Sequence, residues 1–92
     1  MDVVWDPLKD RSNYAKHGVS FSDAEPALYD PAGVTVEDTG DRGEERFITL
    51  GLDALGRIVV VVYTHREADI RIISARRATK RERAQYAEGI RL

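Results

Sequence analysis

The fold is decided by residues 63–86, which read YTHREADIRIISARRATKRERAQY. They follow directly on an apolar run, IVVVVY at 58–63, and contain a second β-branched run, IRIISARR at 70–77, so the pattern predicts two strands joined by a short turn. A Thr-x-x-Glu capping box at 79–82 then predicts a last helix that runs to about Glu88. The stretch holds seven Arg or Lys residues against three acids, a density of charge that a strand hairpin usually avoids.

The residues before this stretch extend the pattern toward the N-terminus. An Asp-Pro pair at 6–7 and the glycine at position 18 predict the start and the stop of a first helix. Helical spacing puts Leu8, Ser12 and Ala15 on the inner face of this helix. The elements expected before residue 58 are, in chain order, a strand at 2–5, a helix at 7–17, a shorter helix at 21–28, and strands at 33–38 and 46–52.

This order of elements, β-α-α-β-β-β-β-α, predicts the fold class. Strands that follow one another with short connections pair as antiparallel neighbours, and an antiparallel sheet needs one face covered. We therefore expect an α+β domain in which an antiparallel sheet is packed by helices on one face.

Length and composition limit the possible classes of protein. The 92 residues are enough for a single domain over 1–92, and 42% hydrophobic with 33% charged residues is typical of a folded globule. The absence of cysteine excludes disulfides, thiol catalysis and cysteine-based zinc sites. No signal peptide or apolar run of membrane-spanning length is present, so we expect a cytoplasmic protein. Neither histidine has a partner at metal-ligand spacing, so no metal or cofactor is expected.

The positive charge is concentrated in one part of the chain. Residues 1–65 carry six Lys or Arg and twelve Asp or Glu, whereas residues 66–83 carry seven basic residues and three acids. A local field of this kind can bind an anion although the net charge is -2. Eleven of the fourteen basic residues are Arg, whose planar fork suits phosphodiester groups.

Two groups of basic residues are candidates for an anion site. Arg66 and Arg71, with Glu67 between them, flank the expected turn, where a merely solvated hairpin tip is an equally good interpretation. The second group favours a phosphate site, because cations at a helix start oppose the macrodipole and gain from a bound anion. This second group consists of Arg76, Arg77, Lys80, Arg81 and Arg83.

The sequence His65-Arg66-Glu67 has the residue types of an acid–base site. It can supply a general acid, a cation and a general base. An alternative is that Glu67 pairs with a neighbouring Arg and that His65 packs at the strand end. For His17, near the end of the first helix, a structural role at the helix dipole is favoured over catalysis.

Four motifs in order resemble the BrnT toxins of bacterial type II toxin–antitoxin pairs, over nearly the whole chain. They are W-D-P-x-K at 5–9, N-x-x-K-H-G-V at 13–19, T-H-R-E at 64–67 and R-I-I-S-A-R-R-A-T-x-x-E at 71–82. The resemblance implies a RelE-like fold and a ribonuclease that inhibits translation. It also implies neutralisation by BrnA, an antitoxin with a ribbon-helix-helix region, in a two-plus-two assembly that contacts operator DNA only through the antitoxin.

The resemblance also transfers site residues. Arg66 and Glu67 match T-H-R-E, Arg76 matches S-A-R-R, and Lys16 and His17 are weaker candidates from the K-H-G-V segment. In a tight hairpin the two arginines would lie about 20 Å apart, so one scissile phosphate cannot touch both unless a bulge or twist intervenes. We expect Arg76 and the last helix to hold flanking phosphates while the Arg66 end acts on the bond. A toxin-fold binding module that only represses transcription with its antitoxin is the alternative.

Overall fold

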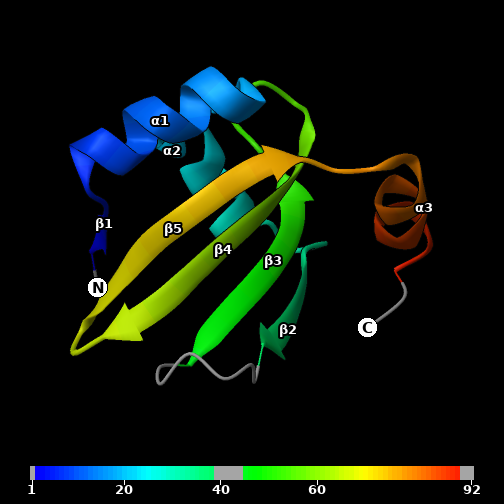
Figure 1. Ribbon diagram of the computed structural model, residues 1–92. Helices are drawn as coiled ribbons and strands as arrows, with labels where there is room; N and C mark the ends of the chain where they lie inside the picture. The colour runs from blue at the N-terminus through cyan, green and yellow to red at the C-terminus, as the bar shows by residue number, and fades with distance from the viewer. Residues whose placement is uncertain (1, 39–44, 90–92) are drawn as a thin grey trace.

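The computed structural model describes residues 2–38 and 45–89 as one five-stranded sheet with helices on its faces (Figure 1). The elements are, in chain order, β1 (Val3–Val4), α1 (Pro7–His17), α2 (Phe21–Ala24), the 3-10 helix η1 (Glu25–Tyr29), β2 (Val34–Asp38), β3 (Arg46–Leu52), β4 (Ile58–Arg66), β5 (Asp69–Arg77) and α3 (Lys80–Glu88). The predicted α+β class and the predicted order of elements are confirmed.

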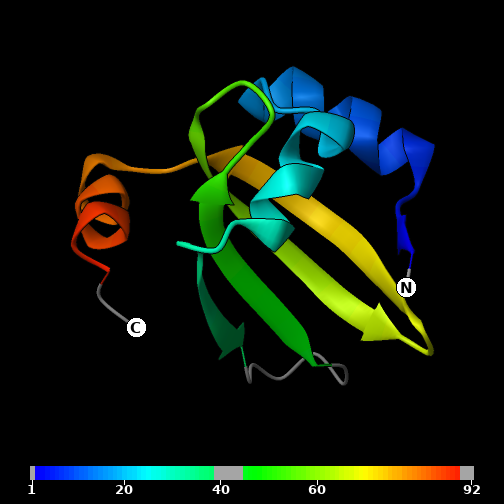
Figure 2. The same ribbon diagram turned by 180° about the vertical axis from the view of Figure 1, so that it is seen from behind.

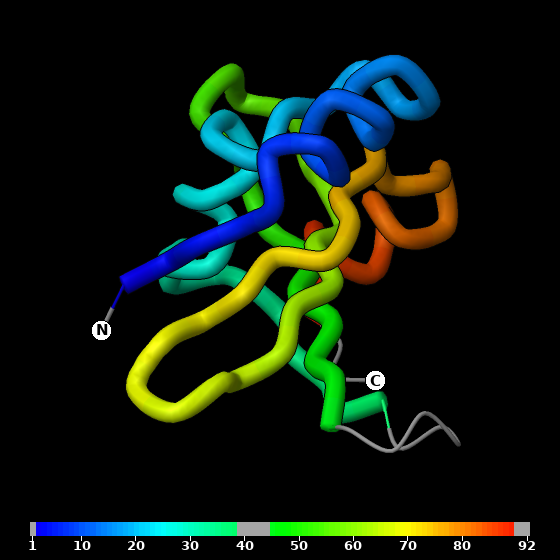
Figure 3. Tube along the Cα trace, turned by 60° about the vertical axis from the view of Figure 1, so that its left-hand side comes forward, coloured from blue at the N-terminus to red at the C-terminus, as the bar shows by residue number. Residues whose placement is uncertain are grey.

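The strands lie in the order β1-β5-β4-β3-β2. The four longer strands pair antiparallel, as predicted, and β4 is the central strand. The short β1 differs, because it pairs parallel with β5 through Val3–Ile70 and Val4–Arg71. Figure 3 shows this N-terminal segment running past the β4–β5 hairpin. The edge of β5 is therefore covered by β1 only near the hairpin tip.

The ends of the helices follow the sequence signals. The Asp6 side chain accepts a hydrogen bond from the Leu8 N–H (2.9 Å), and Gly18 ends α1 with φ 70°. The predicted capping box between Thr79 and Glu82 forms at the start of α3. The expected helix at 21–28 instead continues after Ala24 as the 3-10 helix η1, because a proline near its start removes a backbone donor.

Helices cover both faces of the sheet. On one face, which Figure 2 shows from the front, α2 and η1 pack over the sheet, and Phe21, Val59 and Val61 are fully buried there. The expectation of helices on a single face holds for α2 and η1. The last helix differs, because Tyr86 of α3 packs with Val34 and other apolar residues on the opposite face. We call this opposite face, beyond the part under α3, the open face.

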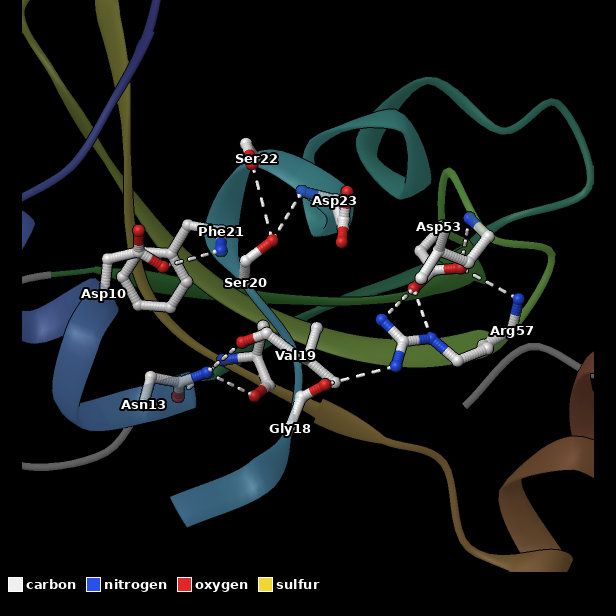
Figure 4. A network of polar contacts seen from close by, with 12 residues as sticks. Asp10, Asn13, Gly18, Val19, Ser20, Phe21, Ser22, Asp23, Asp53 and Arg57 are labelled. Atoms are coloured by element: carbon white, nitrogen blue, oxygen red, sulfur yellow. Dashed lines mark hydrogen bonds and ion pairs between the residues drawn. The ribbon is translucent and has the colours of Figure 1, made fainter. Parts of the chain in front are cut away.

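The inner side of α1 is polar rather than apolar. Leu8 is 68% exposed, so the predicted inner face of the helix was wrong, and Asn13 is the buried residue of α1. Its amide donates to the carbonyls of Val19 (2.9 Å) and Ala75 (2.7 Å) and accepts from the Ala75 N–H (3.1 Å), part of the network in Figure 4. Because α1 lies beside the edge strand β5, outward backbone groups of that strand need a polar partner.

A β-bulge at Ile73 changes which side chains of β5 share a face. Tyr63 pairs with Ile72 and Val62 pairs with Ser74, which leaves Ile73 without a partner on β4. Strict alternation along β5 would place Arg71 and Arg76 on opposite faces of the strand. The bulge puts both on the open face, because the extra residue inverts the alternation after it.

Candidate nucleic-acid interface

A groove lined by basic residues lies between α1 and the β4–β5 hairpin. It consists of two hollows of about 120 and 220 Å³ that share Lys9 and Ile73, and we call the two together the basic groove. Among residues 2–38 and 45–89, no carboxylate lines either hollow. The remaining lining residues are Arg46, Thr64, His65, Arg66 and Arg71 in the first hollow, and Ser12, Asn13, Lys16, His17 and Ser74 in the second.

Two elements bring the cations together. Alternation along β4 places Thr64 and Arg66 on the open face, and Thr64 pairs across the ladder with Arg71 of β5. Lys9 and Lys16 lie two helical turns apart on α1, so they reach the groove from the same side of that helix. The weaker candidates Lys16 and His17 therefore join the groove.

The charged side chains at the hairpin tip have no protein partner. Among residues 2–38 and 45–89, the side chains of Arg66, Glu67 and Arg71 make no hydrogen bond or ion pair with one another or with any neighbour. The alternative in which Glu67 pairs with an adjacent arginine is therefore wrong for this structure. Charges left unpaired by folding are available to a ligand.

Arg76 is placed differently from Arg66. Its guanidinium forms two hydrogen bonds with the carboxylate of Glu82 (2.8 and 3.0 Å), which raises the pKa of Arg76 and lowers that of Glu82 to about 2. It pairs with Val60, six residues before Arg66 on β4, so the Cα atoms of the two arginines are still about 20 Å apart. The bulge places Arg76 on the same face of the sheet as Arg66, but the two residues remain far apart along the strands.

The other predicted basic residues divide between the two faces. Arg77 pairs with Val59, a residue of the helix-covered face, and so points away from the open face. The α3 residues Lys80, Arg81 and Arg83 line none of the hollows beside the hairpin tip, and Arg83 donates to the Ala78 carbonyl (3.1 Å). Among the described residues, the basic residues at the start of α3 therefore do not share a hollow with Arg66 and Arg71.

His65 is one of the residues that line the first hollow, although its ring packs on the other face of the sheet. It pairs with Ile70 of the helix-covered core, and its ring packs edge-on against Phe47 at 4.9 Å between centroids. The ring of Tyr63 is also close, at 6.0 Å. The alternative in which His65 packs at the strand end therefore agrees with the structure.

A third hollow, of about 310 Å³, lies on the N-terminal side of the tip and shares Arg66 and Arg71 with the basic groove. We call it the tip hollow. Its other lining residues are Val4, Trp5, Asp6, Glu67 and Asp69. Glu67 has φ 56°, in the left-handed region that disfavours residues with a Cβ. The tip hollow thus differs from the groove in having acids among its lining residues.

Sequence reasoning missed Lys9 and Arg46 as groove residues. Lys9 had a signal, because it stands seven residues before Lys16 and the two share a helical face. Arg46 had none beyond its place at the start of a strand, since only the register with β4 brings it to the tip. Within the described residues, no group of three or more His, Cys, Asp or Glu is placed to hold a metal ion.

Comparison with known proteins identifies the family of the chain. A family model described as "Ribonuclease toxin, BrnT, of type II toxin-antitoxin system" matches residues 5–82. The chain is therefore a ribonuclease-toxin homologue of type II systems. Within that class it belongs to the BrnT family. Membership implies an antitoxin as partner.

A solved structure shows the same fold. The crystal structure of the Brucella abortus ribonuclease toxin BrnT superposes with a TM-score of 0.65 at 25% sequence identity, covering 87% of this chain and 99% of that chain. A search of curated proteins gives no match. No helix in the described part of the chain is long and apolar enough to cross a membrane.

Proposed function

We propose that this chain is a metal-independent endoribonuclease that cleaves single-stranded RNA held in the basic groove. The observation that carries the proposal is the lining of that groove, to which α1, β3, β4 and β5 contribute basic residues and the described part of the chain contributes no carboxylate. Such a lining attracts a phosphodiester chain and repels nothing in it. The groove ends at Arg66 and Arg71, whose side chains have no partner in the described protein and are free to contact a phosphate.

The reaction needs only groups that the tip supplies. The carboxylate of Glu67 takes the proton of the ribose 2′-hydroxyl, and the 2′-oxygen attacks the adjacent phosphorus. Arg66 and Arg71 stabilise the added negative charge of the phosphorane. The bond from phosphorus to the 5′-oxygen then breaks, the 5′-oxygen takes up a proton, and a 2′,3′-cyclic phosphate remains. His65 is the candidate donor of that proton, and its ring must leave Phe47 to act.

Arg76 has a structural role in this proposal. Its bonds to Glu82 tie the end of β5 to the first turn of α3, about 20 Å from Arg66. Flanking phosphates are held instead by Lys9 and Lys16, which lie along the groove from the tip.

The proposal includes the partner and the cellular effect. RNA cleavage in the cytoplasm inhibits translation, and a BrnA-type antitoxin with a ribbon-helix-helix region neutralises the toxin by covering the basic groove with an acidic segment. Operator DNA is bound only through that antitoxin. The groove supports this arrangement, because an acidic segment would fit the same charges that hold RNA.

The first test is cleavage in the presence of a chelator. Purified protein is incubated with 5′-labelled single-stranded RNA in excess EDTA, and fragments with a cyclic phosphate end are expected. A matched oligonucleotide with a 2′-deoxyribose at the cleaved position is the control and is expected to stay intact. Cleavage that requires added Mg²⁺, or cleavage of the deoxy control, would contradict the mechanism.

A growth assay separates the two functional alternatives. Expression of the chain alone is expected to arrest growth, and co-expression of the neighbouring antitoxin gene is expected to restore it. A binding module that only represses transcription would give no arrest when cleanly expressed. The same cultures report the mechanism, because arrest by a ribonuclease is accompanied by loss of intact RNA.

A further inference from the structure

The tip hollow and the basic groove share a wall and differ in chemistry. Arg66 and Arg71 line both, but Asp6, Glu67 and Asp69 line only the tip hollow, together with Trp5. Counting the described residues, a phosphate would meet three carboxylates in the tip hollow and none in the groove. The backbone of an RNA chain therefore belongs in the groove, and the tip hollow suits a different part of the nucleotide.

We propose that the tip hollow binds the nucleobase on the 5′ side of the cleaved bond and selects bases that present amino groups. This proposal rests on the proposed ribonuclease function and specifies its substrate. The hollow, at about 310 Å³, is at the small end of ligand pockets, which run from roughly 300 to 1,000 Å³ and suit a single planar group at that size. A base placed there puts its ribose beside Glu67 and its 3′-phosphate beside Arg66.

The walls of the hollow match the two surfaces of a base. Trp5 is half-buried, its ring packs edge-on against Phe21 at 6.2 Å between centroids, and it is one of the residues that line the hollow. Single-stranded bases stack on indole rings and on guanidinium planes, and Arg66 and Arg71 supply the latter. Stacking alone does not distinguish one base from another.

The carboxylates supply the discrimination. An ionised carboxylate only accepts hydrogen bonds, so Asp6 and Asp69 favour base edges with N–H donors. Guanine presents two adjacent N–H donors, the largest number of donors on any of the four base edges. Adenine and cytosine each present an amino group. Uracil presents one N–H between two carbonyl oxygens, which the carboxylates repel, so uracil is the base that the hollow disfavours.

Asp6 and Asp69 keep oxygens available for this purpose. One oxygen of Asp6 caps α1 through the Leu8 N–H, and one oxygen of Asp69 accepts from the Asp2 N–H at a long 3.4 Å. Each side chain therefore has a second oxygen with no partner among the described residues. A substitution by Asn keeps the engaged oxygen and removes only the negative charge and one acceptor.

The experiment uses DNA oligonucleotides that carry a single ribonucleotide. Only the bond on the 3′ side of this ribonucleotide can be cleaved, because it alone has a neighbouring 2′-hydroxyl. The base on the 5′ side of the cleaved bond is therefore the base of the ribonucleotide, which is varied among guanine, adenine, cytosine and uracil. Single-turnover rates in EDTA are compared for the full chain. Guanine is expected to be cleaved fastest and uracil slowest, with about a tenfold or larger ratio between them.

Two variants and a control locate the preference in the hollow. Asp6→Asn and Asp69→Asn are each expected to reduce the guanine-to-uracil ratio several-fold, and Asn caps a helix as well as Asp does, so Asp6→Asn should stay folded. Glu37→Gln removes an exposed acid of β2, outside the three hollows, and is expected to keep the ratio. Equal rates on all four substrates, or a ratio unchanged in both Asn variants, would overturn the base pocket.

Failure of the proposed ribonuclease function would give a different result from failure of the base pocket. If no oligonucleotide is cleaved, the ribonuclease proposal fails. Binding of all-deoxy oligonucleotides with each base, followed by fluorescence anisotropy, still tests the hollow in that case. An order of affinity with uracil weakest supports the hollow, and equal affinities overturn it.

Discussion

The two ends of the β4–β5 hairpin carry the same kinds of charged side chain. At one end these side chains form hydrogen bonds and ion pairs, and at the other end they form none within the described residues. At the end away from the tip, buried Asp53 accepts from the backbone N–H groups of Leu55 and Arg57 and pairs with the Arg57 guanidinium at 2.8 Å. Arg57 in turn donates to the Gly18 carbonyl (3.1 Å), which ties the β3–β4 loop to the end of α1 (Figure 4). Each of these charges takes part in holding elements together.

At the tip, Arg66, Glu67 and Arg71 make no such bonds within the described residues. Their charges add nothing to the bonding that holds the fold, and Glu67 even adopts an unfavourable φ. The difference shows that residue type does not separate structural from functional charge in this chain. The presence or absence of a protein partner makes this distinction. Substitutions at the end away from the tip should therefore change stability, whereas substitutions at the tip should change the cleavage rate.

The largest expected effect is at Arg66. Arg66→Ala should lower the cleavage rate by a factor of about 10² to 10³, because it removes a cation that stabilises the transition state, and should leave the melting temperature unchanged. Arg57→Ala is the matched variant from the other end. It should lower the free energy of unfolding by about 3 kcal/mol, because it leaves the buried carboxylate of Asp53 without its charged partner, while the folded fraction keeps its activity. Single-turnover kinetics measure the cleavage rates of the two variants, and thermal unfolding measures their stabilities. A destabilised Arg66→Ala with normal cleavage, together with a stable Arg57→Ala with slow cleavage, would refute the comparison.

Asn13 gives the next largest effect, on stability alone. Asn13→Ala leaves the Val19 carbonyl and both backbone groups of Ala75 without their partner, and should cost about 2–3 kcal/mol. Ser12→Ala, on the exposed side of the same helix, is the control and should cost much less. Urea unfolding midpoints measure the difference. Equal midpoints for the two variants would mean that α1 is not anchored by this amide.

Local signals were enough to predict most of the elements. Strong caps and β-branched runs act over a few residues, so the helix ended by Gly18 and the capping box at Thr79 formed as expected. The parallel pairing of β1 and the position of α3 depend on contacts between distant segments, which no local pattern contains. The inner face of α1 was mispredicted because Leu8 looked like the apolar anchor, whereas a strand edge requires a polar one.

The site was predicted in part for the same reason. Arg66 and Arg71 flank a turn, so their proximity followed from the hairpin alone. Arg76 looked equivalent in sequence, and only the folded chain reveals that Glu82 occupies its guanidinium. Lys9 enters the groove because α1 runs beside β5, a packing that the sequence did not specify.

A smaller effect should appear at acid pH. The hydrogen bonds from Arg76 hold the pKa of Glu82 at about 2, below its ordinary value of 4.5. A depressed pKa in the folded state gives stability that is present above pH 4.5 and is lost as the pH falls toward 2. Glu82→Gln should remove this part of the pH dependence and cost roughly 1 kcal/mol at neutral pH, since the pair is partly exposed. Glu88→Gln, at the other end of α3, is the control for loss of one acid.

The smallest expected change in stability is a gain at the tip, and it tests whether Glu67 lowers stability in return for activity. Glu67→Gly relieves the positive φ and should raise the free energy of unfolding by about 1 kcal/mol, while removing the proposed base should lower the cleavage rate by about 10² or more. Glu67→Gln keeps the strain and should show the rate defect without the gain in stability. A stabilised Glu67→Gly variant with full activity would mean that the carboxylate at the tip has no catalytic role.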